Sequence, residues 1–318
     1  MAHVIRIHQH GDPSVLRIES GGGGTPGAGE VHLVQQAIGI NFVDGMVRDG
    51  SYPQTLPTVP GFEAAGVIAA VGRDVTAFAP GDRVGYFFSA GAYATERTMA
   101  WGPLLRLPDD IPSATAASFL AKGLTAWMGL RALHRLRAGE TALVLGASGG
   151  VGAILSRWAR SLGATVIGVA GSPDKIGGVQ AGSSHALYAG DPAVIEKIRA
   201  MAPAGVDVVY DLVGQATFHL ATAAIRDGGT IATIGAASGQ PRADAGALAQ
   251  RGVAIRGGGT PQMVRGPAVD VATAELWDMI RQGVFADLQI VQYPFADIVR
   301  AHTDMGARRL AGLPVLIV

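Results

Sequence analysis

A short glycine-rich turn, Ala147–Gly152, has the residue types and spacing that suit phosphate binding. Gly149 would let the backbone approach a pyrophosphate, and Gly152 would let a helix pack closely on a strand. Ala147 stands where the G-x-G-x-x-G pattern has its first glycine, and a methyl group fits there if φ is negative. The chain has 46 glycines, so the turn alone is weak evidence. Because an apolar strand precedes it and helically spaced apolar residues follow it, the sequence predicts a dinucleotide site.

The residues after the next predicted strand indicate which dinucleotide binds. NAD sites place an acidic side chain about 20 residues after the glycine turn, but here Ala170, Gly171 and Ser172 occupy these positions. Ser172 can cap the following helix. Lys175 falls in that helix's first turn, where the helix dipole disfavours a cation unless an anion lies nearby. The 2′-phosphate of NADPH would be that anion, so we expect NADP(H); the alternative is a solvated lysine offset by Asp174.

Other familiar catalytic groups form no pattern in this sequence. The chain has no cysteine, which excludes disulfides, a thiolate nucleophile and cysteine-ligated metal sites. Its eight histidines are scattered without ligand spacing, and neither a Ser-His-Asp arrangement nor paired catalytic carboxylates are evident. Hydride transfer agrees with this sparse set, because the developing charge on the acceptor needs only a donor or a solvent proton.

Length and composition restrict the class of protein. With 318 residues, of which 48% are hydrophobic and 16% charged, the chain can bury a large core and is expected to form two domains. The 25 Lys and Arg residues balance 25 Asp and Glu residues without a basic run, which argues against nucleic acid as a partner. No stretch reaches the ~20 apolar residues of a membrane span. We therefore expect a cytoplasmic protein without a membrane partner.

The pattern of predicted secondary structure changes after residue 121. Residues 1–121 contain short strands separated by Gly and Pro, a pattern typical of a β-rich barrel or sandwich. After a helical segment at 123–136, apolar strands alternate with helices, which predicts a doubly wound parallel sheet. The tail has two helical segments and a final strand at 313–318, too little for a core of its own, so we expect it to return to the first domain. The expected divisions are 1–122, 123–261 and 262–318.

Six ordered stretches place the chain near a known family: IGINFVDGMVRDGSYP, GFEAAGVIAAVG, GDRV, ASFLAKGLTAW, GASGGVG and VVYDLVG. In order and spacing the chain resembles the zinc-independent quinone oxidoreductases, the zeta-crystallin branch of the medium-chain dehydrogenase/reductase superfamily. An Ala-x-Gly-Gly-Val-Gly turn is usual in that branch, which accounts for Ala147. The resemblance implies a groES-like catalytic domain interrupted by a Rossmann cofactor domain, NADPH as hydride donor, and a homodimer built through the cofactor domains.

The resemblance also implies roles for individual residues. Asn41 and Tyr52 would be the catalytic contacts at the nicotinamide and substrate end of the site. The residues that would bind the cofactor are Asn41, Thr125, Ser148, Gly149, Gly150, Val151, Gly152, Ser172, Lys175 and Gly235. Within this set, the glycine turn would hold the pyrophosphate, Ser172 and Lys175 the 2′-phosphate, and Thr125 would lie near the nicotinamide. No metal would be bound.

The chain departs from the family pattern at several positions. Phe62 replaces the histidine of the "GHE" motif of zinc-dependent relatives, which suits a chain without cysteine. Arg157 replaces a glutamine in the helix after the turn, and the sequence assigns it no role. Ala189 replaces a tyrosine that often contacts the adenosine phosphate, with Tyr188 one place early, and Leu313 replaces a polar residue. These changes bear on adenosine binding more than on the chemistry.

Quinone reduction is the function expected, with two alternatives. Tyr52 and Asn41 would contact the acceptor; alternatively, Tyr52 is a surface tyrosine in a turn and Asn41 satisfies backbone groups after a strand, while Asp44 is expected to be structural. A rival activity is reduction of an enoyl thioester or a 2-alkenal, in which a tyrosine proton donor matters more. A rival of another class is a non-enzymatic, crystallin-like NADPH-binding protein.

Overall fold

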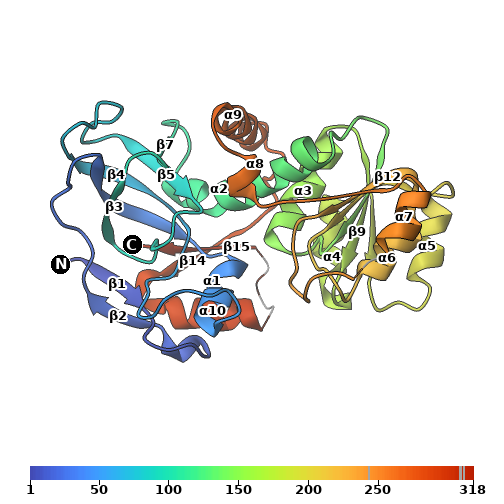
Figure 1. Ribbon diagram of the computed structural model, residues 1–318, viewed down its shortest axis with the longest axis horizontal. Coiled ribbons are helices and arrows are strands. Elements are labelled where there is room, and N and C mark those ends of the chain that lie inside the picture. Colours follow the sequence, from blue (N-terminus) through green and yellow to red (C-terminus); the bar gives the residue numbers. More distant parts are fainter. Residues whose placement is uncertain (243, 308–309, 311) are drawn as a thin grey trace. The chain divides into compact units, whose positions relative to one another are not determined.

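The computed structural model describes residues 1–242, 244–307, 310 and 312–318. The chain divides into two compact units, which Figure 1 shows in ribbon form. The first unit contains Met1–Ala121 and Gln289–Val318, and the second contains Lys122–Leu288. The chain therefore leaves the first unit once and returns to it once.

The first unit is built on a seven-stranded sheet in the order β14-β15-β3-β4-β5-β7, with β6 paired to β3. Strand β3 alternates buried and less buried residues over most of its length, the period of two expected for a sheet with one face on a core. A separate antiparallel pair, β1-β2, completes the unit's strands. The strands are β1 (His3–Arg6), β2 (Arg17–Ser20), β3 (Glu30–Gly39), β4 (Glu63–Val71), β5 (Arg83–Phe87), β6 (Glu96–Ala100), β7 (Leu105–Arg106), β14 (Ile290–Pro294) and β15 (Leu313–Ile317).

The second unit holds a six-stranded parallel sheet in the order β10-β9-β8-β11-β12-β13. The central strands are buried almost without interruption, as expected for a parallel sheet covered on both faces. Figure 1 shows α3 and α4 on one face of this sheet and α5, α6 and α7 on the other. The strands are β8 (Thr141–Leu145), β9 (Thr165–Ala170), β10 (His185–Tyr188), β11 (Val206–Asp211), β12 (Ile225–Thr233) and β13 (Ala254–Gly257).

The helices that the apolar periodicity predicts between the strands of the second unit and in the tail are present, with shifted ends, while the helices at Phe42–Asp49, Ala245–Gln250 and Thr260–Met263 were not predicted. Helix α2 runs from the first unit into the second and continues as a π-helix at Met128–Leu133. The α-helices are α1 (Phe42–Asp49), α2 (Ser113–Trp127), α3 (Gly150–Ser161), α4 (Ile176–Gly182), α5 (Val194–Met201), α6 (Phe218–Ala224), α7 (Ala245–Gln250), α8 (Thr260–Met263), α9 (Pro267–Arg281) and α10 (Ile298–Gly306). The predicted α/β architecture, a β-rich unit plus a doubly wound parallel sheet, is confirmed.

The return of the chain to the first unit begins later than residue 262. Residues up to Leu288 belong to the second unit. The physical reason is the packing of α9 and the segment after it: Arg157 bonds Asp287, and the ring of Trp158 meets that of Phe285 edge to face at 6.1 Å. Only from Gln289 does the chain rejoin the first unit, where β15 pairs antiparallel with β3.

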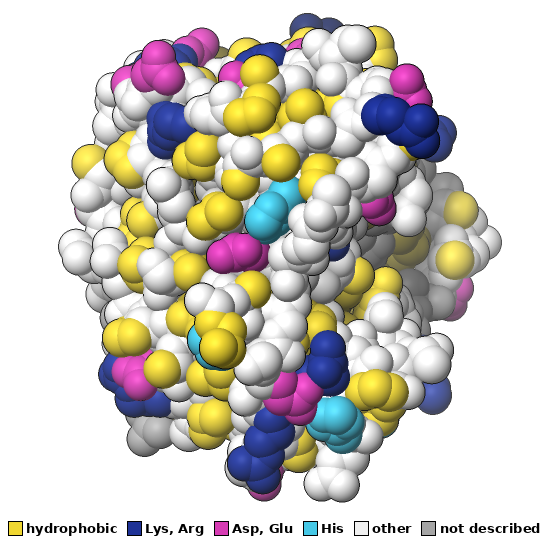
Figure 2. Space-filling model, turned by 90° about the vertical axis from the view of Figure 1, so that its left-hand side faces the viewer, with side chains coloured by type: hydrophobic (Ala, Val, Ile, Leu, Met, Phe, Trp, Pro, Cys, Tyr) yellow, Lys and Arg dark blue, Asp and Glu magenta, His cyan; other side chains and the backbone are white. Residues whose placement is uncertain are grey.

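The surface of the first unit carries mixed charges. In the face drawn in Figure 2, cationic and anionic side chains lie next to one another and do not gather into one basic field. Ion pairs such as Arg6–Glu19 at 2.6 Å and Arg106–Asp82 at 2.9 Å show the same intermixing. Within the described part of the chain, no helix combines the length and apolar character needed to cross a membrane.

Candidate functional site

The predicted phosphate turn joins β8 to α3 at the carboxyl edge of the parallel sheet. Gly146 has a φ of 83°, so the left-handed position falls one residue before Ala147. Ala147 is buried and is not among the described non-glycine residues with positive φ. The alanine in place of the motif's first glycine therefore causes no backbone strain.

Two further glycines shape the approach to this turn. A Cβ on Gly152 would lie closer than 3.0 Å to the carbonyl oxygen of Gly146, so only glycine lets α3 pack this tightly on the strand end. Gly149 is exposed and is the N-cap of the 12-residue helix α3. A glycine N-cap has no side chain to accept the first-turn N–H groups, which are therefore available to an anion.

Gly235 lies at the same edge of the sheet. Its N–H donates to the carbonyl of Asp211 at 3.1 Å, and the N–H of Leu212 donates to Leu145 at 3.2 Å, which joins the ends of β8, β11 and β12. A Cβ on Gly235 would lie 2.6 Å from the Leu212 carbonyl oxygen. The strand order reverses between β8 and β11, the position where open α/β sheets bind ligands. The predicted residues of the glycine turn and Gly235 are thus brought together in the second unit.

Asp211, at the end of β11, is a buried carboxylate that sequence reasoning did not single out. Its Oδ1 accepts the N–H groups of Val213 at 3.0 Å and Gly214 at 2.9 Å, which shapes the loop beside the glycine turn. Burial raises the pKa of Asp211, while these two donors act in the opposite direction. Among the described residues, Oδ2 has no hydrogen-bond partner. The strand-ending aspartate in VVYDLVG was the available signal.

The segment after β9 holds the residues expected at the 2′-phosphate. Ser172 precedes a short 3-10 turn, Pro173–Lys175, and makes no side-chain cap bond there, contrary to the expectation. The nearby Ser172 hydroxyl, then the Asp174 backbone N–H and the charge of Lys175, lower the pKa of Asp174. A Cβ on Gly171 would meet no atom within 4 Å, so the position of the acidic residue of NAD sites is open.

Thr125 lies in the part of α2 that belongs to the second unit. Its hydroxyl is 2.8 Å from that of the buried Thr260 at the start of α8. This hydrogen bond fixes the position of Thr125 relative to α8.

Asn41, in the first unit, is the N-cap of α1 and forms a capping box with Asp44. The Asn41 backbone N–H donates to Asp44 Oδ2 at 2.7 Å. Its side-chain Nδ2 donates to Oε2 of the buried Glu63 at 2.9 Å. Asn41 therefore does satisfy local groups, and Asp44 has the structural role expected of it. Sequence reasoning missed Glu63, although it lies in the GFE motif.

Tyr52 lies beyond the other end of α1 and is 43% exposed. The helix ends at Gly50 with a φ of 88°, and the Tyr52 N–H donates to the Met46 carbonyl at 3.0 Å. The Tyr52 ring contacts Phe62 edge to face, with ring centroids 6.2 Å apart. Phe62, which replaces a metal-ligand histidine, therefore supports the tyrosine while leaving its surface accessible.

A series of hydrogen-bonded polar side chains holds α1 in place. Arg48 Nη1 donates to His302 Nδ1 at 3.3 Å, so the other ring nitrogen of neutral His302 carries the proton and donates to the Tyr93 oxygen at 2.9 Å. The Tyr93 hydroxyl donates to Asp44 at 3.0 Å. Burial, and then the charge of Arg48, lowers the pKa of His302 to about 3.

Arg157, which had no role on sequence grounds, ties α3 to the segment after α9. Its guanidinium bonds Asp287 through two contacts of 2.7 and 2.6 Å and the Ala153 carbonyl at 3.0 Å. The Arg157 side chain is 8% exposed, and it lowers the pKa of Asp287. Of the other departures, Leu313 is buried in β15, and the backbone N–H of Ala189 donates to the Ala170 carbonyl at 3.0 Å.

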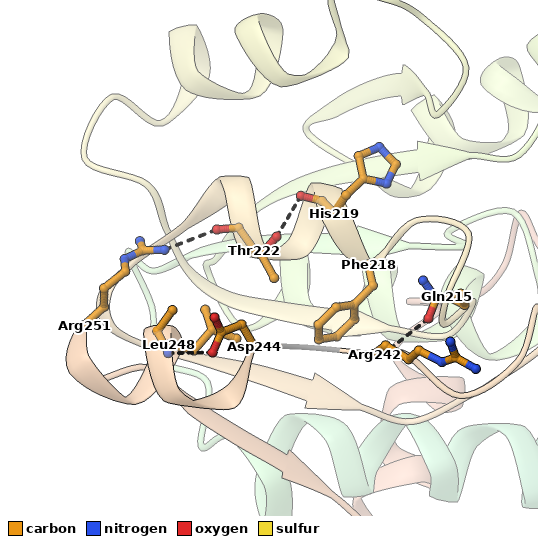
Figure 3. Close-up of a pocket in the computed structure, with 9 residues that line it drawn as sticks. Gln215, Phe218, His219, Thr222, Arg242, Asp244, Leu248 and Arg251 are labelled. Atoms are coloured by element: carbon orange, nitrogen blue, oxygen red, sulfur yellow. Dashed lines mark hydrogen bonds between the residues drawn. The ribbon is translucent and has the colours of Figure 1, made fainter.

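A separate pocket lies between α6 and α7 in the second unit, with a volume of about 420 Å³ (Figure 3). Two hydrogen bonds lie in its wall: Arg251 donates to the Thr222 carbonyl at 3.3 Å, and Gln215 accepts the Arg242 backbone N–H at 2.8 Å. None of the predicted site residues line it. Across the described ranges, no group of three or more His, Asp or Glu could hold a metal ion.

Two family models match the chain. The alcohol dehydrogenase GroES-like domain matches residues 27–109, and the zinc-binding dehydrogenase family matches residues 150–271. These two matches fall in the first and second units, respectively.

Similar proteins cover the chain from end to end. It is 34% identical to the quinone oxidoreductase of Pseudomonas aeruginosa over 332 residues, with 100% of both chains covered. It is also 34% identical to the 2-haloacrylate reductase of a Burkholderia species, with 98% of this chain and 97% of the relative covered. The crystal structure of Escherichia coli quinone oxidoreductase complexed with NADPH superimposes with a TM-score of 0.93 at 31% identity, covering 99% of this chain and 100% of that one.

Proposed function

The chain belongs to the quinone oxidoreductases of the medium-chain dehydrogenase/reductase superfamily, and we propose that it transfers a hydride from NADPH to a quinone without zinc. The observation that carries the proposal is the full-length similarity to a quinone oxidoreductase solved with NADPH. The open position at Gly171 supports NADPH over NADH, because the acid that holds the NAD ribose is missing.

The residues of the second unit fit a dinucleotide. The close packing at Gly152, the exposed N-cap Gly149 and the uncapped first turn of α3 leave N–H donors for a pyrophosphate. We assign Ser148–Gly152 to the pyrophosphate, Lys175 with Ser172 to the 2′-phosphate, and Thr125 and Gly235 to the nicotinamide end. NADPH, when bound, supplies the hydride.

The chain's own contribution to quinone reduction is orientation and hydrogen bonding. As hydride arrives, negative charge develops on the acceptor oxygen, and a donor aimed at it lowers the barrier. We assign this contact to Asn41, whose Nδ2 retains a second hydrogen beyond the one given to Glu63, and to the hydroxyl of the half-exposed Tyr52.

Reduction of an activated alkene is the second candidate, favoured by the similarity to the 2-haloacrylate reductase. In that reaction hydride goes to one carbon and a proton to its neighbour, so a proton donor at Tyr52 becomes essential. The same fold and cofactor would serve both reactions.

An acceptor comparison separates the two candidates. We expect NADPH oxidation with a benzoquinone to be faster than with a crotonyl thioester or an alkenal. Tyr52→Phe should reduce any alkene activity by about 100-fold, because a general acid is lost, and quinone activity far less. Faster turnover of the alkenes by the unaltered protein would reverse the assignment, and equal losses in Tyr52→Phe would remove Tyr52 as the discriminating residue.

We also propose a cytoplasmic homodimer formed through the second unit. Strand β13 is an edge of the parallel sheet, and its Ile255 is 40% exposed, which suits pairing with a second copy. Light scattering of the purified protein should give twice the chain mass, and Ile255→Lys should shift it toward the monomer. A monomeric unaltered protein would contradict the dimer.

The cytoplasmic location is supported by the NADPH dependence, since that reductant is kept inside cells. Cell fractionation tests this location.

A further inference from the structure

Glu63 is a buried carboxylate that is hydrogen-bonded to Asn41, the proposed catalytic contact. It has no exposed surface. Its Oε2 accepts the side-chain Nδ2 of Asn41 at 2.9 Å, and its Oε1 accepts the backbone N–H of Ala121 at 2.6 Å. One carboxylate therefore connects the start of α1 with α2.

The position of Glu63 is sterically defined. A Cβ on Gly39 would lie closer than 3.0 Å to the Glu63 carboxylate and to the Ala117 carbonyl oxygen, so β3 is glycine where this side chain passes. Pairing with Phe87 in β5 holds the backbone of Glu63, and the close approach to Gly39 leaves its buried carboxylate little room to move. Glu63 is thus a fixed acceptor.

A fixed carboxylate decides which end of the Asn41 amide faces it. The Glu63 oxygens accept hydrogen bonds, whereas an amide side chain has a donor end and an acceptor end. Nδ2 must therefore face Glu63, and Oδ1 must face elsewhere. The capping box with Asp44 agrees with this orientation, because the Asn41 side chain meets the N–H side of the first helical turn there. What remains for a ligand is the second Nδ2 hydrogen.

We propose that Glu63 is a positioning residue that holds Asn41 as a hydrogen-bond donor toward the acceptor oxygen. This rests on the proposed function, since it assigns a purpose to the Asn41 contact. Without the carboxylate the amide can turn over, and an acceptor then faces the oxygen on which negative charge develops.

A cycle of variants tests the coupling. Glu63→Gln replaces one acceptor oxygen by a donor; we expect the Ala121 N–H to keep the remaining oxygen and the Asn41 amide to flip against the new NH₂ group. In the unaltered background kcat for a benzoquinone should fall by about 10-fold or more, the scale of losing one donor at a developing charge. In an Asn41→Ala background the same change should lower kcat by less than about 2-fold, because coupled residues are not additive.

A second test uses the swapped pair Glu63→Gln with Asn41→Asp. The introduced glutamine amide can then donate to the new carboxylate with the net charge unchanged, so we expect the Tm lost in Glu63→Gln to recover. The kcat should not recover, because position 41 would then present only acceptors. Asp207→Asn is the matched control: Asp207 also accepts one backbone and one side-chain N–H, from Thr141 and Arg226, and lies in the other unit. It should lower Tm and leave kcat unchanged.

The outcomes separate the two proposals. Equal losses of kcat for Glu63→Gln in both backgrounds, or recovery of kcat together with Tm in the swapped pair, would reduce Glu63 to a structural residue and overturn the inference. Unaltered kcat in Asn41→Ala would overturn the Asn41 contact and the positioning role with it. Loss of activity in Asn41→Ala but not in Glu63→Gln would overturn only the positioning role.

Discussion

We expect single residues after β9 to set the cofactor preference. Lys175 follows β9 together with Ser172, and the neighbouring Gly171 leaves open the position that an acidic side chain occupies in NAD sites. A cation next to an uncharged position favours a dinucleotide with one more phosphate.

Lys175→Ala should weaken NADPH binding by about 10-fold or more, since a charge-assisted hydrogen bond contributes about 1.5 to 3 kcal/mol. NADH binding should change little, because NADH lacks the 2′-phosphate. Fluorescence titration of both cofactors measures the difference. Lys197→Ala, which removes a surface lysine paired with Asp191, is the control and should alter neither affinity. If NADPH and NADH weaken equally in Lys175→Ala, the assignment of the 2′-phosphate to this residue is wrong.

Local motifs allowed residues such as Gly149 and Gly152 to be predicted from sequence, because strand, turn and helix are adjacent along the chain. Long-range partners had no such signal. Arg157 bonds Asp287, which lies 130 residues later in the chain. Asn41, just after β3, bonds Glu63 at the start of the neighbouring strand β4. Nothing in the spacing of these residues marks them as pairs, so only the fold reveals what each one binds.

The turn between β8 and α3 depends on close packing of the helix on the strand end. Gly152→Ala would place a methyl group against the Gly146 carbonyl, where the backbone cannot yield easily. We expect a loss of about 1 to 3 kcal/mol in the free energy of unfolding, typical of overpacking, and weaker NADPH binding because α3 must shift. Urea denaturation and cofactor titration measure the two effects.

Gly178→Ala is the matched control within α4. A Cβ there would meet no atom within 4 Å. Because alanine favours a helix over glycine by roughly 0.5 to 1 kcal/mol, stability should stay the same or rise, and cofactor affinity should not change. A Gly152→Ala variant as stable as this control would contradict the close packing of α3 on the strand.

The sequence predicted the presence of helices and strands better than it predicted the residue at which the chain passes from one unit to the other. The helical pattern near α9 was evident, but whether α9 packs on the first or the second unit depends on contacts such as that of Gly123 with Leu276. Amphipathic periodicity shows that a helix has an apolar face and does not show what covers that face. This is why the expected boundary at residue 262 differs from the observed one at Gln289.

For the molecule as a whole, His302 links stability to pH. Burial lowers its pKa in the folded protein to about 3, against an ordinary value of 6.5. Between these values the unfolded chain binds more protons than the folded chain, so the free energy of unfolding falls as pH is lowered through this window. Between about pH 7 and about pH 5 the contribution of this group is about 2 kcal/mol.

His302→Gln should remove that contribution. Glutamine can still accept from Arg48 and donate to Tyr93, as the neutral histidine does, but it does not titrate. Urea denaturation at the two pH values should therefore show a smaller loss of stability in the variant, while the exposed His219→Gln keeps the full loss. An unchanged pH dependence in His302→Gln would show that other groups cause the acid sensitivity.

Quinone reduction by NADPH without zinc is tested by the stoichiometry of hydroquinone formed per NADPH consumed, with a benzoquinone acceptor and a metal chelator present. We expect one hydroquinone per NADPH, at a rate that depends on the protein and not on the chelator. NADPH consumption no faster than in the absence of protein, or a rate abolished by the chelator, would contradict it.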